Sequence, residues 1–177
     1  MLIVGRNLHS LSEQHGIVDG ANCFDEFSLT LHLDDRITQI EPTSDKSPPV
    51  VYGEDIPKGW IKTTAIPASG LVLKSKSCLL ACSAETVCMP DGYFGFVQTK
   101  GTLARLFVQI HCCDGQVEPG YKGKVTFEIC NLASFDIRIK PRQPVAQLFL
   151  MKTSTKGTKL YNGRYQGADG PTISTPG

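Results

Sequence analysis

Residues 98–131 read QTKGTLARLFVQIHCCDGQVEPGYKGKVTFEICN, and this stretch decides the fold. Its last run, residues 125–130, alternates apolar and polar side chains, as a half-buried β-strand does. One face carries Val125, Phe127 and Ile129, and the other carries Thr126, Glu128 and Cys130. Glu128 is therefore a carboxylate in the middle of a strand, with two cations, Lys100 and Arg105, upstream of it.

Working outward, the chain predicts a mainly β protein. Short β-type runs between turn residues recur from Trp60 onward, at intervals typical of an all-β sandwich or barrel. We expect strands at residues 28–33, 50–52, 61–66, 70–73, 77–83, 86–89, 94–99, 106–112, 125–130, 135–139 and 145–151. One short helix is predicted over residues 3–16, where apolar residues form a helical stripe and Gly16 suits a C-cap.

The length of the chain and the absence of a linker-like segment predict a single domain over residues 1–177. Residues 152–177 are rich in glycine, threonine and serine and hold few large apolar side chains. This segment is either a disordered tail or a mobile C-terminal arm that orders over a ligand. The arm is favoured by Tyr161, Arg164, Tyr165 and Gln166, which are unusual in a spacer.

Charge and cysteine content narrow the function classes. With 18 Lys and Arg against 17 Asp and Glu, the net charge is +1. This balance argues against binding to nucleic acid or to an anionic membrane. Seven cysteines, without a signal-like or membrane-spanning run, predict a reduced, cytoplasmic location.

Zinc binding is the alternative use of these cysteines. However, Cys78 and Cys82 lack a second pair at zinc-finger spacing. Cys112 and Cys113 would point to opposite faces of the predicted strand. We therefore expect buried small apolar thiols and no metal site.

Three segments, in order along the chain, carry a resemblance to a known family. They are KGTLARL at 100–106, VEPGYKGKVTFEICNL at 117–132 and RYQGADGPTIS at 164–174. They resemble the dCTP deaminase family of the dUTPase-like superfamily, whose motifs run R-S-S-L-A-R-L, I-D-P-G-[FW]-x-G-x-[IV]-x-L-E-[FLI]-x-N and [KR]-Y-Q-G-Q-x-G-P-x-x-S. Weaker similarity in FDEFSLTLHL at 24–33 and LVLKSKSCLLACSAETVCMP at 71–90 extends the resemblance over most of the chain.

The resemblance implies a distorted jelly-roll or β-barrel with a short N-terminal helix and a flexible C-terminal arm. It implies a homotrimer with active sites at subunit interfaces. The implied substrate is a deoxynucleoside triphosphate with Mg²⁺ on its phosphates. The implied reaction is the hydrolytic deamination of dCTP to dUTP and ammonia without zinc, and the chain lacks the H-x-E and P-C-x-x-C signature of the zinc deaminases.

The resemblance also assigns roles to individual residues. Glu128 matches the catalytic glutamate, which would act as general base towards water and then as general acid towards the leaving amine. Arg105 would orient this glutamate and stabilise the developing negative charge. Glu118 is expected near the sugar 3′-hydroxyl. The substrate-binding set would comprise the loop residues Lys100, Gly101, Thr102, Leu103, Ala104 and Arg105, the backbone of Thr126 and Phe127 at the base, and Tyr161, Arg164 and Gln166 on the arm.

Four positions depart from the family pattern. Gly101 replaces a serine, Glu118 an aspartate, Ala168 a glutamine and Thr30 an aspartate. A lost hydrogen bond to a ligand costs ~1–3 kcal/mol, so these changes bear on activity.

Three functions therefore stay open. The first is a dCTP deaminase. The second is a dUTP diphosphatase or a bifunctional enzyme that forms dUMP and pyrophosphate, with Glu118 activating water. The third is a nucleotide-binding homologue without turnover, which the changes at Gly101 and Ala168 favour.

Overall fold

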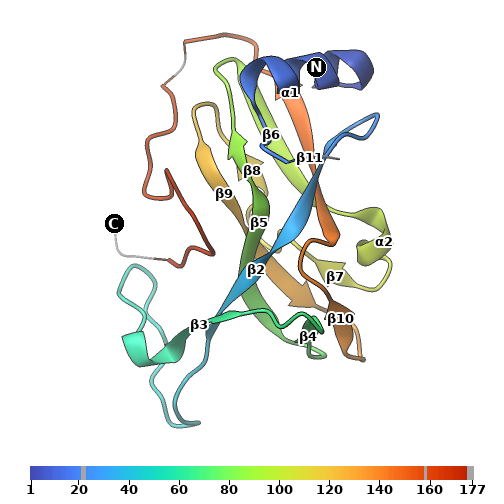
Figure 1. The fold of residues 1–177 in the computed structure, drawn as a ribbon. Helices are drawn as coiled ribbons and strands as arrows, with labels where there is room; N and C mark the ends of the chain where they lie inside the picture. Colours follow the sequence, from blue (N-terminus) through green and yellow to red (C-terminus); the bar gives the residue numbers. More distant parts are fainter. Residues whose placement is uncertain (21–22, 158, 175–177) are drawn as a thin grey trace.

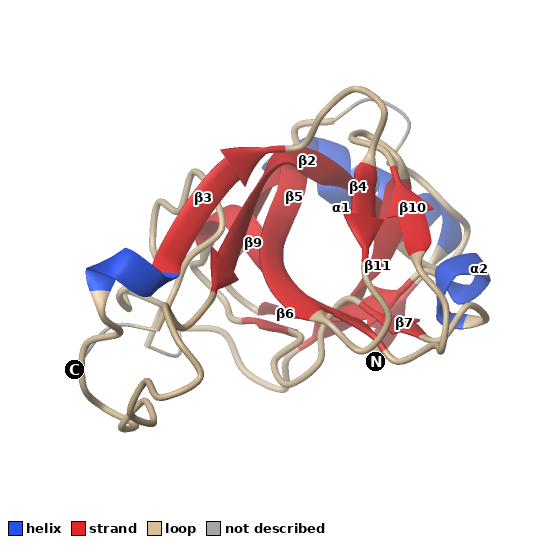
Figure 2. Ribbon diagram, turned by 90° about the horizontal axis from the view of Figure 1, so that it is seen from below, coloured by secondary structure: helices blue, strands red, loops and turns tan. Residues whose placement is uncertain are grey.

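The computed structural model describes residues 1–20, 23–157 and 159–174. The fold is mainly β, as predicted. A nine-stranded sheet has the order β7-β9-β5-β2-β11-β6-β8, with β1 added on β11 and β3 on β2. A two-stranded sheet pairs β10 with β4. Figure 2 shows that the strands curve round into an open barrel.

The bounds of the elements are as follows. The strands are β1 (Leu2–Ile3), β2 (Leu29–Ile40), β3 (Ile61–Ala65), β4 (Leu71–Leu73), β5 (Cys78–Cys88), β6 (Tyr93–Thr99), β7 (Val108–Gln109), β8 (Gln116–Val117), β9 (Lys122–Asn131), β10 (Ile137–Ile139) and β11 (Pro144–Lys152). The helices are α1 (Gly5–His15), the 3₁₀ turn η1 (Lys58–Trp60) and α2 (Gly101–Ala104). No helix in the described ranges is long and apolar enough to cross a membrane.

Helix α1 confirms the predicted N-terminal helix. Leu8 is fully buried on the barrel side, and Leu11 packs against the same core. Gly16 ends the helix in the left-handed conformation (φ 58°), and its N–H donates to the carbonyl of Glu13. A glycine in this position carries no Cβ penalty, which is why the helix stops there.

The core is built by strand alternation. Completely buried side chains on three strands of the large sheet are Leu29, Leu31 and Leu33 of β2, Ala146, Leu148 and Leu150 of β11, and Phe127 and Ile129 of β9. Each large apolar side chain buried in this way contributes roughly 1.5–3 kcal/mol. The alternation predicted for β9 is therefore confirmed, and Thr126 and Glu128 lie on its outer face, where they are only partly exposed.

Two predicted strands are wrong. Residues 50–52 form no strand but an exposed turn, in which the N–H of Glu54 donates to the carbonyl of Val51. The strand expected over residues 106–112 shrinks to β7. Helix α2 precedes it, and Phe107 adopts a left-handed conformation (φ 61°) that interrupts an extended run.

As a consequence, Cys112 and Cys113 lie in a bend and not on opposite faces of a strand. The two strands predicted at 77–83 and 86–89 are one strand, β5. Its pairing with β9 shifts register between Cys82 and Thr86, which marks a β-bulge.

Candidate active site

A pocket of about 380 Å³ lies on the outer face of the sheet, beneath the C-terminal segment. Its floor includes Leu80 of β5 and Thr126 and Glu128 of β9, which the pleat turns away from the core. It is lined by Ile40, Ile56, Leu80, Asp114, Gln116, Val117, Glu118, Tyr121, Val125, Thr126, Glu128, Tyr161, Tyr165, Thr172, Ile173 and Ser174. The pocket thus brings together a strand, the loop before it and the end of the chain.

The carboxylate of Glu128 is held by the loop that precedes β8. Its Oε2 accepts the backbone N–H groups of Cys113 (2.7 Å) and Asp114 (3.2 Å). Two donors on one oxygen fix the orientation of the side chain, and hydrogen bonds to an ionised acceptor are among the stronger ones. Within the described residues, Oε1 accepts no hydrogen bond, so this oxygen is available to a water molecule or a substrate.

Two further carboxylates line the same pocket. Glu118 follows β8, and Asp114 lies on the loop, where its Oδ1 accepts the N–H of Gln116 (3.1 Å). Both residues are exposed, in contrast to the partly buried Glu128. The pocket therefore offers a fixed carboxylate beside two solvated ones. Oxygen donors of this kind suit Mg²⁺.

Two tyrosines, Tyr121 beside β9 and Tyr161 on the arm, line one side of the pocket. The hydroxyl of Tyr121 donates to the carbonyl of Lys124 (2.6 Å), and burial, with the nearby Tyr161, raises the pKa of Tyr121. The rings of Tyr121 and Tyr161 meet edge to face, with centroids 5.6 Å apart. These neutral aromatic groups give the pocket an apolar side that a planar base could contact.

The C-terminal segment docks along β9, and its described residues, 153–157 and 159–174, form no helix or strand (Figure 1). Gln166 accepts the N–H of Lys122 (2.9 Å) and donates to the carbonyl of Gly120 (3.0 Å). The N–H of Lys124 donates to the carbonyl of Ala168 (2.7 Å), and that of Thr172 to Oγ1 of Thr126 (3.1 Å). These hydrogen bonds, each of which involves at least one backbone group, hold this arm over the pocket.

Two glycines of the E-P-G-Y-K-G sequence allow this close approach. A Cβ on Gly120 would lie 2.7 Å from the Cβ of Leu160, and a Cβ on Gly123 would lie 2.8 Å from the backbone nitrogen of Ala168. Real Cβ atoms do not approach other atoms so closely. The arm passes so close to these two positions that only glycine fits there.

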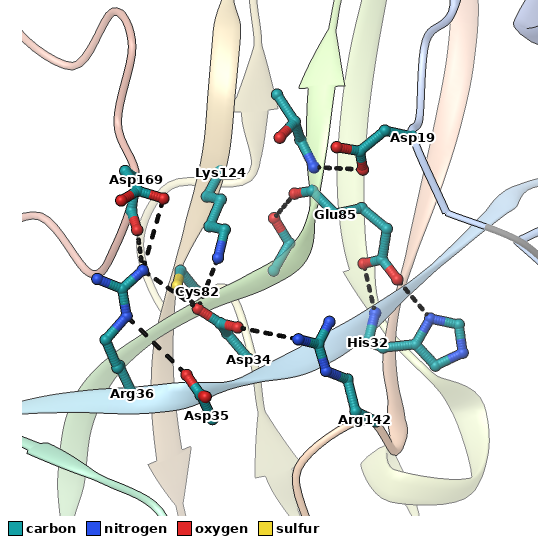
Figure 3. A network of polar contacts seen from close by, with 12 residues as sticks. Asp19, His32, Asp34, Asp35, Arg36, Cys82, Glu85, Lys124, Arg142 and Asp169 are labelled. Atoms are coloured by element: carbon teal, nitrogen blue, oxygen red, sulfur yellow. Dashed lines mark hydrogen bonds and ion pairs between the residues drawn. The ribbon is translucent and has the colours of Figure 1, made fainter.

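A network of charged groups around the buried Asp34 also contacts the arm (Figure 3). Asp34, only 2% exposed, accepts from Nζ of Lys124 at 2.8 Å, and Arg36 lies 3.5 Å away. Arg36 in turn donates to the backbone carbonyl of Asp169 on the arm. Burial acts to raise the pKa of Asp34, but the hydrogen bonds from Lys124, the N–H of Asp35 and Cys82 outweigh it and lower this pKa.

The cationic segment lies elsewhere. Lys100 precedes α2, and Arg105 follows it, with Nη1 donating to the carbonyl of Gly101 (3.1 Å). No residue from 100 to 105 is among those that line the pocket. In Figures 1 and 2, α2 and the C-terminal arm lie on opposite sides of the barrel. The predicted catalytic pair, Glu128 and Arg105, is therefore not brought together within the described part of one chain.

Other predicted substrate-binding residues divide in the same way. Glu118, Thr126, Glu128 and Tyr161 line the pocket. The side chain of Phe127, whose backbone was the predicted contact, points into the core, and Leu103 packs against the core. Arg164 is exposed, and Gln166 uses its amide to fasten the arm to Lys122 and Gly120. Sequence reasoning missed several lining residues. Asp114, Tyr121 and Thr172 come from loops whose path only the folded chain defines.

The surface around α2 is apolar and exposed. Phe107 is 64% exposed, and Leu106, Leu132 and Phe135 are also exposed. The N–H of Leu132 donates to the carbonyl of Phe107 (2.9 Å), so the segments that carry these side chains adjoin. Exposed apolar residues that gather in this way are typical of an interaction surface.

The fold is shared with a solved structure. The crystal structure of the 2′-deoxycytidine 5′-triphosphate deaminase from Agrobacterium tumefaciens superposes with a TM-score of 0.71, at 16% identity, over 88% of this chain and 49% of that one. A sequence model of the dCTP deaminase-like family matches residues 6–153. The chain belongs to the dCTP deaminase-like family, and the predicted resemblance is confirmed.

Similar curated proteins carry related names. A protein from Acidothermus cellulolyticus, named "dCTP deaminase, dUMP-forming", is 37% identical over 101 residues, which cover 54% of this chain and 53% of the relative. A "dCTP deaminase" from Haloarcula marismortui is 27% identical over 162 residues, which cover 80% of this chain and 83% of the relative. The chain thus spans about half the length of the dUMP-forming relative.

Proposed function

We propose that this protein converts dCTP and two water molecules into dUMP, ammonia and pyrophosphate. The observation that carries the proposal is the presence of Glu128 and Glu118 in one pocket beneath the arm. One carboxylate is anchored by two backbone N–H groups, and the other is solvated. The dUMP-forming relative supports this combination of two hydrolyses.

In the first hydrolysis, Glu128 acts on the cytosine ring. Oε1 takes a proton from a water molecule, whose oxygen attacks C4 of the base. The same carboxyl group then returns the proton to the amino group, the C–N bond breaks, and ammonia leaves. The amides of Cys113 and Asp114 keep Glu128 oriented through both transfers.

In the second hydrolysis, Glu118 takes a proton from another water molecule, which attacks the α-phosphorus. The bond to the bridging oxygen breaks, and pyrophosphate leaves. Magnesium, when bound with the nucleotide, would neutralise phosphate charge, and the exposed Asp114 carboxylate would hold it directly or through water.

The cations of α2 would come from another copy of the chain in a homotrimer. The exposed apolar side chains at Leu106 and Phe107 support such an interface, because they directly follow α2, which lies across the barrel from the chain's own arm. A head-to-tail contact closed into a ring would set the α2 of each copy against the pocket of the next. Arg105 and Lys100 would then contact the reacting base and the phosphates.

A deaminase that stops at dUTP is the second candidate. It is favoured by the Haloarcula relative, whose match covers more of both chains. Loss of turnover is the third outcome, which the departures at Gly101 and Ala168 favour.

Incubation with dCTP, dCMP or dUTP and Mg²⁺, followed by chromatography and by ammonia and pyrophosphate assays, separates these functions. We expect dUMP, ammonia and pyrophosphate from dCTP. Glu128→Gln should release ammonia ~10²–10⁴-fold more slowly, whereas Glu118→Gln should release ammonia and accumulate dUTP. Glu54→Gln, which changes an exposed carboxylate outside the pocket, serves as the matched control. Nucleotide binding without any product would overturn the proposal.

A further inference from the structure

A second cluster of reactive side chains lies outside the pocket. Cys23 comes just before β2, His32 lies on β2, and Glu85 lies in the bulge of β5. One ligand atom from each of these residues lies within 4.8 Å of the other two. Cys23 is fully buried and Glu85 is 6% exposed, so the cluster is an interior feature of the fold.

The β5 bulge positions the carboxylate. Glu85 Oε2 accepts the backbone N–H of His32 (2.9 Å), and Oε1 lies 2.7 Å from Nδ1 of the same residue (Figure 3). The hydroxyl of Ser83 donates to the carbonyl of Glu85 (2.7 Å) and fixes the backbone. The Sγ of Cys23 lies 3.9 Å from Oε1. Three donor atoms of different types are therefore held around one point.

The local charge favours a cation at this point. The carboxylates of Glu85 and Asp19 lie close enough to the Cys23 thiol to interact with it electrostatically. Among the described residues, His32 is the only basic side chain that contacts Glu85. A bound divalent ion would stabilise the thiolate and balance the acidic groups.

Main chain closes over the cluster. A Cβ on Gly20 would lie 2.7 Å from Sγ of Cys23 and 2.8 Å from Cγ of Glu85, so no side chain fits between this backbone and the donors. Asp19, the next residue back, uses Oδ1 to accept the N–H of Thr86 (2.8 Å). The chain that follows α1 is thus fastened to the β5 bulge at the same place.

We propose that Cys23, His32 and Glu85 bind a divalent, borderline-soft cation, with Zn²⁺ as the preferred ion. Sulfur, nitrogen and carboxylate oxygen are the donors that zinc takes, whereas Mg²⁺ and Ca²⁺ prefer oxygen alone. Zinc bonds of about 2.0–2.3 Å in a tetrahedron separate the ligand atoms by roughly 3.3–3.8 Å. The observed separations of 2.7 and 3.9 Å lie on either side of this range.

Three protein ligands leave a fourth position for water or for the Asp19 carboxylate. The ion would fasten the segment between α1 and β2 to the sheet, and its role is structural. The prediction of buried thiols is confirmed for Cys23 and Cys82 but is wrong for Cys78, Cys112 and Cys113, which are exposed. One partner of Cys23, Glu85, lies 62 residues further along the chain, and zinc-finger spacing does not reveal it.

The test uses the full chain and metal ions alone. After gel filtration, elemental analysis should find about one zinc per chain. Co²⁺ added after chelation should give a thiolate-to-cobalt charge-transfer band. Cys23→Ser should lose this band and weaken zinc binding more than ~100-fold. Cys88→Ser, at a cysteine outside the cluster, should retain both.

Thermal unfolding gives an independent measurement. Zinc at about one hundred times its Kd should raise Tm by roughly 5–10 °C in the wild type, and this shift should vanish in Cys23→Ser. If Cys23→Ser does not fold, His32→Gln provides the same comparison.

The proposal is overturned by either of two results. One is the absence of retained metal together with an unchanged Tm. The other is a cobalt band that survives Cys23→Ser but disappears on Cys112→Ser or Cys130→Ser, which would assign binding to other thiols.

Discussion

Two regions of this molecule come from one stretch of sequence yet differ in kind. The carboxylate pocket is built by the chain itself, with Glu128 oriented by backbone amides and covered by the arm. Arg105 follows α2 and does not line this pocket, and its sequence neighbours Leu106 and Phe107 are exposed apolar residues. The pocket holds its carboxylate in place within one chain, whereas the Arg105 of that chain does not line the pocket. This difference motivates the proposed homotrimer, in which the α2 segment of one copy would complete the pocket of the next.

The largest expected effects come from removing one group from each region. Glu128→Gln should lower kcat for ammonia release by ~10²–10⁴-fold, because proton transfer is lost. Arg105→Ala should lower it by ~10²–10³-fold, although Arg105 does not line its own pocket, because charge stabilisation is lost. Steady-state kinetics check both values, with Arg6→Ala on α1 as the control. Wild-type activity in Arg105→Ala would show that Arg105 takes no part in the deamination.

A smaller effect is expected from lifting the arm. Gly123→Ala places a Cβ against the Ala168 backbone, so the arm should detach and kcat/KM should fall roughly 10–100-fold. Limited proteolysis should show earlier cleavage within residues 153–174. Gly59→Ala, at a position where a Cβ meets nothing within 4 Å, is the matched control. Unchanged proteolysis and kinetics would show that arm docking does not support binding.

The smallest effect on activity is expected at Asp34, whose variant should change stability more than turnover. Asp34→Asn should lower the free energy of unfolding by about 1–3 kcal/mol at pH 7, because Lys124 and Arg36 lose their ionised partner.

The pH dependence follows from the lowered pKa of Asp34. Its ionised form stabilises the fold above the unfolded value near pH 4, and this contribution is lost as the pH falls further. Denaturant unfolding between about pH 2 and 7 should therefore show a gap between wild type and Asp34→Asn that closes in acid. A gap that stays constant would contradict the assigned role.

Local patterns in the sequence predicted much of this structure. The alternation around Phe127 and Glu128 gave the correct inner and outer faces of β9, and Gly16 gave the correct end of α1. Both depend on neighbours in the sequence, whose geometry is fixed by the period of the element.

What failed depends on contacts between distant segments. The left-handed Phe107 ended a predicted strand, and the β5 bulge brought Glu85 to Cys23 and His32. Arg105 and Glu128 are close in the sequence, but Arg105 does not line the pocket that contains Glu128 in the same chain.

Subunit complementation tests the two-copy site most directly. Glu128→Gln and Arg105→Ala proteins would be denatured together in equal amounts, refolded and assayed for ammonia release from dCTP, with each protein refolded alone as the control. If each site takes its glutamate from one copy and its arginine from the next, the mixture should regain about one quarter of wild-type activity. If both groups act from the same chain, no site in the mixture is intact. Activity no higher than that of either variant alone would then contradict the shared site.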